Sequence, residues 1–359
     1  MDKTFALIMA GGVGTRFWPK SRTKLPKQYL NLTGDETMIQ AAARRFQSLL
    51  PDERIFIVTT KDQEALVNEQ LPWIKKENII HEPMGKNTAP CIGLSAIHIQ
   101  AHDPDAVMIV APADHLITNT EEYQHVLENG VKIIRKNPSA LVTIGIEPTY
   151  PATGYGYIQR GKPLKGNNGN AFRVKAFAEK PNLEVAQQFF SSGEFLWNSG
   201  TFLWRADTIL SELDELMPDL YDSLLKIKLV LNKPDLQKVT EKVYKEIFSE
   251  SIDYGVMEQA SNVIVLEGTF GWSDLGSWQE VYKLAPKNKD GNVIFGKPIL
   301  KNVTNSYIET SDRVVAVLGV DNLIVVDTPD ALLICDRKYS QDVKWVVEKL
   351  KHSERKTIL

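Results

Sequence analysis

Over its first 145 residues the chain alternates short runs of β-branched or aliphatic residues with longer amphipathic stretches. The short runs predict strands and the longer stretches predict helices, so strand and helix follow one another in turn. We expect strands at 5–9, 55–60, 79–81, 107–112 and 141–145, with helices at 38–50, 63–71, 88–101 and 123–135. This rhythm predicts a Rossmann-like, doubly wound α/β sheet, whose ligands bind at the carboxyl ends of the strands.

Length and composition narrow the class of protein further. A chain of 359 residues with 43% hydrophobic and 24% charged residues is typical of a soluble globular protein, and both disorder and a membrane protein are excluded. The net charge of -3 provides no bulk positive field for nucleic acid or anionic lipid. The first apolar run is too short for a signal peptide, and the two cysteines lack CxxC spacing. We therefore expect a cytoplasmic protein that binds neither nucleic acid nor membrane.

After residue 150 the alternation becomes less regular. We expect strands at 155–159, 173–178 and 200–204 and helices at 184–190 and 208–216, and interpret this part as an insertion that adds a second wall to the crevice. The polar segment 285–292 is the best linker in the chain, which predicts domains at 1–285 and 293–359. Short strands at 314–318, 323–326 and 332–335 and a helix over 343–350 predict a small C-terminal β-helix-like domain, although no repeat period is visible.

A glycine-rich segment, Ala10-Gly11-Gly12-Val13-Gly14-Thr15-Arg16, directly follows the first expected strand. Glycines at such a position let backbone N–H groups approach a phosphate closely. The segment is not a P-loop, because no Gly-Lys-Ser/Thr ends it, and Phe17 stands where a dinucleotide fingerprint needs glycine. A glycine turn without a ligand is the alternative.

Five cationic residues follow or end this glycine segment. Because Pro19 and Pro26 interrupt the stretch, it cannot form a regular helix and is expected to be a loop. Five positive charges on one loop suit a triphosphate, whereas a solvated basic loop is the alternative. The residues are Arg16, Lys20, Arg22, Lys24 and Lys27.

The stretch GGVGTRFWPKSR at 11–22, followed by Pro26-Lys27-Gln28, resembles the signature of the sugar-nucleotide pyrophosphorylases, in the form found in mannose-1-phosphate guanylyltransferases. The resemblance implies that Arg16 and Lys27 hold the nucleotide triphosphate. It also implies a fold with a nucleotidyltransferase domain of Rossmann-like type. The nucleotide-binding residues implied for this loop are Ala10, Gly11, Gly12, Gly14, Thr15, Arg16 and Lys27.

Two further segments extend the resemblance on the nucleotide side. Glu82-Pro83 and Asn87-Thr88-Ala89-Pro90 resemble the part of the family that reads the base, so Glu82, Asn87 and Thr88 are implied to bind the nucleotide. A carboxylate is a natural acceptor for the N1–H and the N2 amino group of guanine. Without the family context, Glu82 would be interpreted as a surface charge at a strand end.

Asp114 stands directly past an apolar strand, and Asp274 lies in Gly271-Trp272-Ser273-Asp274-Leu275-Gly276, between a strand and a helix. The resemblance implies that the two aspartates together hold Mg²⁺, and that Asp114 also contacts the nucleotide. Each by itself would more often be a cap or a turn residue. His98 and His102 share helical spacing but lack a third ligand, and we interpret them as a partly exposed pair.

The sugar phosphate side is implied by three more segments. Phe177-Ala178-Glu179-Lys180-Pro181 and Trp197-Asn198-Ser199-Gly200 resemble the family's sugar-binding segments, so Glu179 and Asn198 are expected to bind hydroxyls and Lys180 the phosphate. Gly154 allows close approach in the sugar-side strand. Asp253 is a weaker candidate, and Gly255 stands beside it where the family usually has alanine.

The reaction implied by the resemblance is GTP plus α-D-mannose 1-phosphate giving GDP-mannose and pyrophosphate, with Arg16, Lys27, Asp114 and Lys180 as catalytic residues. A phosphomonoester is largely ionised at neutral pH, because its second pKa is about 6. No general base is needed, which fits the lack of a Ser-His-Asp or Cys-His arrangement.

Three alternatives stay open. They are a pyrophosphorylase for another nucleotide or hexose phosphate, a non-catalytic regulatory paralogue, and a general α/β binding module. The paralogue is disfavoured because the charged site residues are all present, and the module because it leaves four motifs unexplained. A homodimer is expected from the family. Since the C-terminal part carries no histidine-rich motif of a fused isomerase domain, a single activity is expected.

Overall fold

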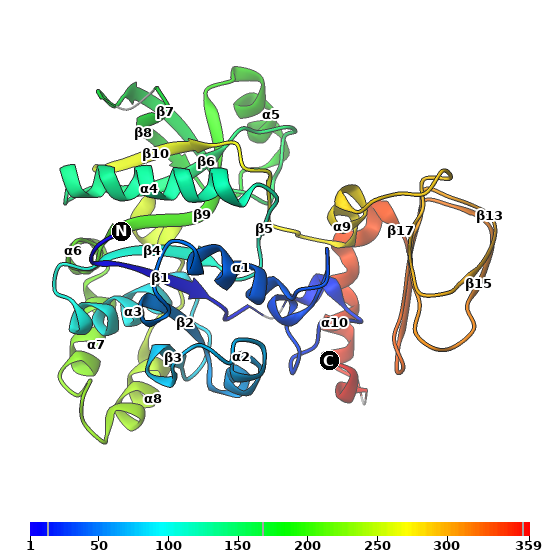
Figure 1. The fold of residues 1–359 in the computed structure, drawn as a ribbon, viewed down its shortest axis with the longest axis horizontal. Helices are drawn as coiled ribbons and strands as arrows, with labels where there is room; N and C mark the ends of the chain where they lie inside the picture. Colours follow the sequence, from blue (N-terminus) through cyan, green and yellow to red (C-terminus); the bar gives the residue numbers. More distant parts are fainter. Residues whose placement is uncertain (13, 167–168, 354) are drawn as a thin grey trace. The chain divides into compact units, whose positions relative to one another are not determined.

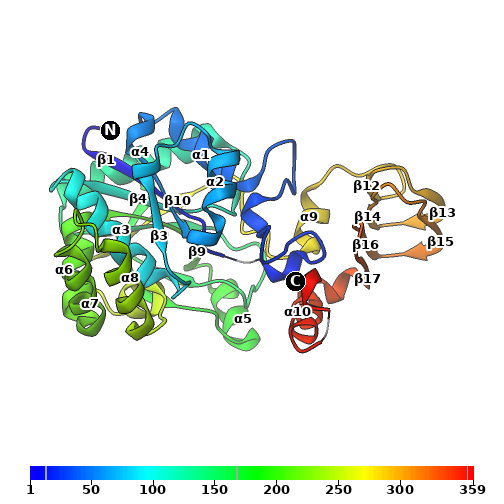
Figure 2. The same cartoon turned by 90° about the horizontal axis from the view of Figure 1, so that it is seen from below.

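The structure is a computed structural model, and it describes residues 1–12, 14–166, 169–353 and 355–359 (Figures 1 and 2). The chain divides into two compact units, each built from separate stretches. Unit 1 comprises Met1–Gly11, Ala42–Ala113 and Ile117–Trp272, and unit 2 comprises Gly12–Ala41, Asp114–Leu116 and Ser273–Leu359. The glycine loop therefore leaves unit 1 after Gly11 and belongs to unit 2 from Gly12 onward.

Unit 1 is built on one nine-stranded sheet with the order β3-β2-β1-β4-β9-β6-β10-β8-β7 (Figure 1). Its strands are β1 (Thr4–Met9), β2 (Ile55–Thr60), β3 (Ile79–Glu82), β4 (Val107–Pro112), β6 (Leu141–Ile146), β7 (Tyr157–Pro163), β8 (Ala171–Ala178), β9 (Phe195–Arg205) and β10 (Val263–Gly268). β1 pairs in parallel with β2 and with β4, where Ile8 lies opposite Ile57 and Ala111. The predicted doubly wound α/β fold is confirmed.

Among the described residues, eight helices contribute to this unit, and all but two of them were predicted within a few residues. They are α1 (Met38–Gln47), α2 (Glu64–Gln70), α3 (Thr88–His102), α4 (Thr120–Lys136), α5 (Leu183–Ser192), α6 (Ala206–Leu216), α7 (Pro218–Lys228) and α8 (Leu236–Glu246). α7 and α8 were not predicted. The residues of α3 are buried on nearly every side, so this helix lies inside the core with Phe56, Met108 and Trp204.

The strands after residue 150 continue the main sheet. β9 lies between β4 and β6 and is antiparallel to both, with Leu203 opposite Ile109 and Val142. Phe202, Leu203 and Trp204 are all buried, which is typical of a central strand covered on both faces. These strands therefore extend the main sheet, and the second wall that this part is expected to add to the crevice stays a prediction.

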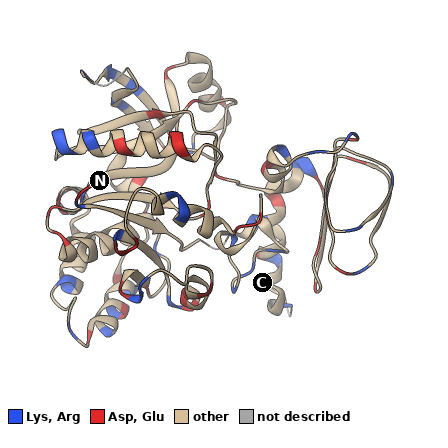
Figure 3. Cartoon of the chain, viewed as in Figure 1, with Lys and Arg blue, Asp and Glu red and all other residues tan. Residues whose placement is uncertain are grey.

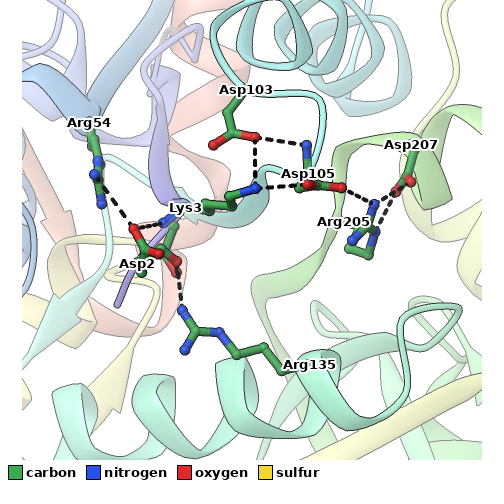
Figure 4. Close-up of polar contacts among 9 residues, drawn as sticks. Asp2, Lys3, Arg54, Asp103, Asp105, Arg135, Arg205 and Asp207 are labelled. Carbon is green, nitrogen blue, oxygen red and sulfur yellow. Dashed lines mark hydrogen bonds and ion pairs between the residues drawn. The ribbon is translucent and has the colours of Figure 1, made fainter.

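An ion-pair network lies at the amino ends of the central strands (Figure 4). Lys3 precedes β1 and pairs with Asp105 at 2.7 Å, and Arg205 bridges Asp105 at 3.2 Å and Asp207 at 2.6 Å. Lys3, Asp105 and Asp207 are about half exposed and Arg205 is 23% exposed, so water screens each pair and its contribution to stability is small. The network lies at the sheet edge opposite to the carboxyl strand ends, where ligands of such folds bind.

Unit 2 contains a small module of parallel rungs (Figure 2). Its strands are β12 (Val293–Phe295), β13 (Ile299–Thr304), β14 (Tyr307–Glu309), β15 (Ala316–Asp321), β16 (Leu323–Asp327) and β17 (Leu332–Asp336). Val293 pairs with Tyr307, which pairs with Ile324, while β13 and β15 form a second parallel sheet. The predicted β-helix-like domain is confirmed. Its successive rungs differ in length, which explains why the sequence shows no repeat period.

Helices α9 (Trp278–Leu284) and α10 (Val343–Lys351) pack in the core of unit 2. The predicted apolar stripe of α10 is confirmed, because Val343 and Val347 are buried there together with Phe17 and Trp18. The short strands β5 (Leu116–Ile117) and β11 (Trp272–Ser273) contain the points at which the chain changes unit. Within the part of the chain that the structure describes, no helix is long and apolar enough to cross a membrane.

Candidate active site

The glycine loop in unit 2 folds around Lys27. Gly14 has a φ of +66°, and a Cβ at this position would overlap Cβ of Lys27, so only glycine fits. The carbonyl of Gly14 accepts a hydrogen bond from Ser21 Oγ at 2.6 Å, and Gln28 Nε2 donates to the Gly12 carbonyl at 3.0 Å. The spacing of glycines and polar residues in the motif is thus required to bring the two ends of the loop together.

Lys27 joins three separate stretches of unit 2. Its side chain is only 6% exposed, and Nζ donates to Asp114 Oδ2 at 2.9 Å and to the carbonyl of Asp274 at 2.5 Å. The three residues border one cavity of about 220 Å³. The cavity is lined by Gly14, Thr15, Arg16, Phe17, Lys27, Asp114, His115, Asp274, Leu275 and Gly276. Apart from Gly12, the residues predicted to hold phosphate and metal in this unit therefore lie around one cavity.

The charges in this cavity are arranged to keep Asp114 ionised. Burial opposes the ionisation of Asp114, but attraction to Lys27 and His115 outweighs it and lowers the pKa of the carboxyl. Arg16 is exposed and makes no ion pair or hydrogen bond with the residues that the structure describes. The cavity thus offers one buried cation, already paired, and one exposed cation that can reach an anion.

The donor set of the cavity fits a hard divalent cation bound partly by substrate. Asp114 and Asp274 supply carboxylate oxygens, and Mg²⁺ is usually bound by one or two carboxylates plus phosphates and water. Among the described residues, no group of three or more His, Cys, Asp or Glu side chains could hold a metal by itself. His102 is exposed and His98 partly exposed, as interpreted from the sequence.

The backbone beside Asp274 is held in an uncommon conformation. Leu275 is fully buried and has a φ of +43°, and a Cβ at Gly276 would lie 3.0 Å from Asp274 Oδ2. Non-glycine residues with positive φ are strained, and such strain is found mainly at functional sites. The conformation places the Asp274 carbonyl against Lys27 and its carboxylate at the cavity.

Three of the five loop cations, Lys20, Arg22 and Lys24, do not line the cavity. Lys20 Nζ pairs with Glu309 at 2.6 Å, and Arg22 pairs with Asp330 at 2.7 Å and donates to the carbonyl of Ile358. The expectation that all five cations suit a triphosphate was therefore wrong for Lys20 and Arg22. Their partners lie 289 and 308 residues further along the chain, which the sequence pattern could not reveal.

The alternative of a solvated basic loop is also wrong. Phe17 and Trp18 are buried, Phe17 packs edge-on against Trp278 at 5.2 Å between ring centroids, and Trp18 Nε1 donates to the Ile358 carbonyl at 3.0 Å. The loop is therefore part of the core of unit 2.

On the base side, in unit 1, Glu82 ends β3 and is buried, with 2% of its surface exposed. Its Oε1 accepts a hydrogen bond from Tyr244 Oη at 3.3 Å, while a Cβ on Gly11 would lie 3.6 Å from Oε2. Burial raises the pKa of Glu82 to about 7, although hydrogen bonds with Cys91 and Tyr244 oppose the shift. The interpretation of Glu82 as an exposed charge at a strand end was wrong.

The next predicted nucleotide residues hold their own segment in place. Asn87 has a φ of +71° and caps α3, since its side chain accepts from the Thr88 backbone at 2.9 Å. Thr88 Oγ1 accepts from the Ile252 backbone at 2.8 Å. These contacts show structural roles for both side chains, and their contact with a nucleotide stays a prediction.

On the sugar side, also in unit 1, Glu179 and Lys180 form an ion pair at the end of β8. Lys180 has a φ of +48°, and the Glu179 backbone donates to Glu258 Oε1 at 2.9 Å. A Cβ on Gly156 would overlap Oε2 of Glu179, whereas a Cβ on Gly154 would meet nothing within 4 Å. Gly156 was missed by the sequence analysis, although its place in the Gly154-Tyr155-Gly156 repeat was a signal.

Asn198 connects the sugar-side carboxylates to the sheet. Its Nδ2 donates to Asp253 Oδ1 at 2.9 Å, and its Oδ1 accepts from Thr143 Oγ1 at 3.0 Å, which fixes the orientation of the amide. Burial and the nearby charge of Glu179 raise the pKa of Asp253 to about 7, opposed by Lys180. The structure thus places four of the predicted sugar residues in one polar network, namely Glu179, Lys180, Asn198 and Asp253.

Comparison with known proteins agrees with this geometry. Residues 5–291 match the family described as nucleotidyl transferase, and residues 298–350 match the mannose phosphate isomerase/GMP-like β-helix domain. The mannose-1-phosphate guanylyltransferase of Escherichia coli K12 is 41% identical over 361 residues, covering 99% of this chain and 75% of that relative. The enzyme of the same name from Klebsiella pneumoniae is 40% identical, covering 97% and 74%.

Among solved structures, one described as the mannose-1-phosphate geranyltransferase of Thermus thermophilus aligns with a TM-score of 0.86. It is 32% identical and covers 97% of this chain and 99% of its own. Members of the nucleotidyl transferase family generally use a divalent metal ion. The chain therefore belongs to the nucleotidyl transferase family and, within it, to the mannose-1-phosphate guanylyltransferases.

Proposed function

We propose that the chain transfers GMP from GTP to α-D-mannose 1-phosphate, giving GDP-mannose and pyrophosphate. The observation that carries the proposal is the contact of the buried Lys27 Nζ with Asp114 and with the Asp274 carbonyl, beside the glycine loop and Arg16. This arrangement suits the displacement of pyrophosphate from a nucleotide triphosphate. The names of the E. coli and K. pneumoniae relatives support the choice of GTP and mannose 1-phosphate.

The chain's own residues would act by positioning and by charge. An oxygen of the sugar phosphate attacks the α-phosphorus in line, and no residue has to remove a proton because the phosphomonoester is already largely ionised. Arg16 and Lys27 stabilise the negative charge that grows on the departing pyrophosphate. Lys180 binds the sugar phosphate and lowers the repulsion between the two anions.

We propose Mg²⁺ as the metal ion, held by Asp114 and Asp274. When bound, the ion neutralises phosphate charge and orients the triphosphate. Asp114 is suited to this task because the neighbouring Lys27 keeps it ionised. Asp274 is suited because the strained turn at Leu275 fixes its carboxylate at the same cavity.

The remaining predicted residues are assigned to the base, the sugar or the phosphates. Glu82 accepts hydrogen bonds from guanine, with Asn87 and Thr88 shaping the segment next to it. The sugar is bound by Gly154, Glu179, Asn198 and Asp253. The phosphates meet the backbone of Ala10, Gly11, Gly12, Gly14 and Thr15.

Three further predictions accompany this proposal. A domain boundary between 285 and 293 is supported by the two family matches, which meet near this segment. The cytoplasmic location and a homodimer rest on the sequence and the family resemblance. Light scattering coupled to gel filtration tests the dimer.

A non-catalytic paralogue is the main alternative of another class. Such a protein needs no ionised acid beside a buried cation, yet Lys27 and Asp114 are paired and Arg16 is exposed at their cavity. The same observation disfavours a general binding module. This observation does not discriminate between nucleotides, so the nucleotide preference has to be measured.

The test measures pyrophosphate release with Mg²⁺, mannose 1-phosphate and each of GTP, ATP, UTP and CTP, and then repeats the best nucleotide with glucose 1-phosphate. We expect the fastest release with GTP and mannose 1-phosphate. Fastest release with UTP, or no release with any nucleotide, would contradict the proposal.

A further inference from the structure

Three titratable side chains meet at the buried end of β3, and the reaction proposed above uses only one of them. Glu82 is 2% exposed, and Tyr244 from α8 and Cys91 from α3 are its hydrogen-bond partners. Tyr244 is fully buried in the main core of unit 1. A buried hydroxyl is destabilising unless it forms hydrogen bonds, so the partners of the Tyr244 hydroxyl matter.

The Tyr244 hydroxyl has a choice between two acceptors. Its oxygen lies 3.3 Å from Glu82 Oε1 and 3.3 Å from the carbonyl of Pro90, and it has one proton to donate. When Glu82 is ionised, the carboxylate is the stronger acceptor and takes this proton. When Glu82 is protonated, the carboxyl can donate to the tyrosine, whose own proton then turns to Pro90.

We propose that Tyr244, together with Cys91, is a positioning residue that favours the ionised form of Glu82, orients its carboxylate to read guanine, and so sets the preference for this base. The proposal rests on the role of Glu82 in the proposed function. Tyr244 donates to Oε1 from α8, and Cys91 is the second hydrogen-bond partner of the carboxyl, from α3. Oε2 faces Gly11, just past the end of β1, where the nucleotide is expected.

The ionisation state of Glu82 decides which base fits. Guanine presents two donors on this edge, N1–H and the N2 amino group, and an ionised carboxylate accepts both. A neutral carboxyl presents one donor and one acceptor, so it leaves a donor of guanine opposed by another donor. Inosine presents N1–H alone, which a neutral carboxyl can still accept.

The immediate neighbours of the Glu82 carboxyl are uncharged, namely the Cys91 thiol, the Tyr244 hydroxyl and the backbone of Gly11. Glu82 also lines a cavity of about 330 Å³, and the titratable side chains that share this cavity are Lys61, Glu64, His81, His98 and Glu241. Burial raises the pKa of Glu82 to about 7 despite the two hydrogen bonds. Loss of either donor would therefore leave a larger share of the enzyme with Glu82 protonated at neutral pH.

The test compares GTP with ITP in wild type, Tyr244→Phe and Cys91→Ala, each with mannose 1-phosphate and Mg²⁺ over a range of pH. In Tyr244→Phe we expect KM for GTP to rise about tenfold with little change in kcat, as for a lost hydrogen bond to a charged group. The ratio of kcat/KM for GTP to that for ITP falls, and the acid limb of the GTP profile moves to higher pH. Cys91→Ala shows the same changes to a smaller extent.

Tyr123→Phe is the matched control, because Tyr123 is another buried tyrosine of unit 1, whose hydroxyl meets Thr201 at 3.5 Å. It should keep the wild-type ratio and profile. If both Tyr244→Phe and Cys91→Ala keep them as well, the proposal is overturned. The Cys91→Ala result decides the question if Tyr244→Phe does not fold.

Glu82→Gln separates this proposal from the proposed function. If Glu82→Gln loses the GTP preference while the Tyr244 and Cys91 variants keep it, only the positioning role is wrong. If Glu82→Gln itself keeps the preference for GTP over ITP, the base-reading role of Glu82 is wrong and the positioning role falls with it. Loss of preference in all three variants supports both.

Discussion

Two carboxylates in this molecule lie at the carboxyl ends of parallel strands of the same sheet, and their pKa values are shifted in opposite directions. Asp114 follows β4 and belongs to unit 2, where Lys27 lowers its pKa despite burial. Glu82 ends β3 in unit 1, where its partners are neutral and burial raises its pKa to about 7. Asp114 has a cation beside it and a side chain that is 35% exposed, whereas Glu82 has neutral partners and is 2% exposed. The surroundings of each carboxyl, and not its place at a strand end, therefore decide its ionisation.

Lys and Arg residues are spread along the ribbon, with Asp and Glu residues interspersed among them (Figure 3). In unit 2 a permanent negative charge beside a buried cation suits phosphates and metal. In unit 1 acids near their titration point suit hydrogen bonding to neutral groups, and Asp253 on the sugar side resembles Glu82 in this respect. The two units therefore differ in their electrostatics: unit 2 suits the chemistry of phosphates, and unit 1 suits recognition of the base and the sugar.

The largest effect is expected from Lys27→Met, which removes the buried cation beside Asp114 in unit 2. We predict a loss on the order of 10²–10³ in kcat/KM, typical for removal of one stabilising charge at the reacting centre. Pyrophosphate release measures it, and circular dichroism checks the fold. Lys24→Met is the control, because Lys24 is an exposed cation of the same loop that lies outside the cavity. Turnover of Lys27→Met within a few-fold of Lys24→Met contradicts the assignment.

The second effect concerns Glu82 in unit 1 and the pH dependence of the free energy of unfolding. The folded pKa of Glu82 is about 7, above the usual value of an unfolded glutamate. The folded protein therefore keeps a proton that the unfolded chain loses, and stability falls as pH rises towards 7. We predict that Glu82→Gln removes a decline on the order of 3 kcal/mol between about pH 4.5 and 8.

Urea unfolding of both proteins across this pH range measures the difference. Asp253 contributes a decline of the same sign in both proteins, so the difference between them isolates Glu82. Parallel curves for wild type and Glu82→Gln would show that Glu82 is ionised throughout, as Asp114 is.

The third effect comes from the loop anchor. Arg22 pairs with Asp330 and donates to the Ile358 carbonyl, and its side chain is 14% exposed. We predict that Arg22→Met lowers the free energy of unfolding by about 1–3 kcal/mol and raises KM for GTP, because it loosens the loop that carries Arg16 and Lys27. Asp330→Asn should have a smaller effect, since the Asp330 side chain is half exposed. Equal effects of the two variants would show that only the ion pair with Asp330 holds the loop, and that the hydrogen bond to the Ile358 carbonyl contributes nothing.

The smallest effect is expected from Gly156→Ala. The added Cβ would overlap the end of the flexible Glu179 side chain and lie 3.4 Å from Asn198 Cβ and Phe177 Cε1, so the carboxylate moves and the fold is kept. We predict that KM for mannose 1-phosphate rises by about threefold to tenfold, as for one weakened hydrogen bond. Gly34→Ala, in open space, serves as the control. An unchanged KM would show that Glu179 does not bind the sugar.

Much of the fold could be predicted because local patterns determine it. The alternation over the first 145 residues predicted strands and helices close to their observed bounds, since the central strands are continuous buried apolar runs and helices such as α4 bury one face with a helical period. The antiparallel place of β9 could not be predicted, because its pairing with β4 and β6 depends on distant residues and no local pattern encodes strand direction.

For the site, motifs identified Lys27, Asp114 and Asp274 around their cavity, because these residues follow strand ends or glycine turns. Tyr244 could not be found, since it lies 162 residues from Glu82 in a helix that has no motif. The positive charge of Lys20 led to the wrong prediction that it holds phosphate, because its partner Glu309 lies far along the chain in the C-terminal module.

The separation of phosphate chemistry from base reading can be tested in one measurement, the ratio of kcat/KM for GTP to that for ITP in Lys27→Met and Glu82→Gln. We predict that Lys27→Met lowers both values by the same factor and leaves the wild-type ratio, whereas Glu82→Gln lowers the ratio towards one. A ratio that changes in Lys27→Met as much as in Glu82→Gln, or that is unchanged in Glu82→Gln, would contradict the account.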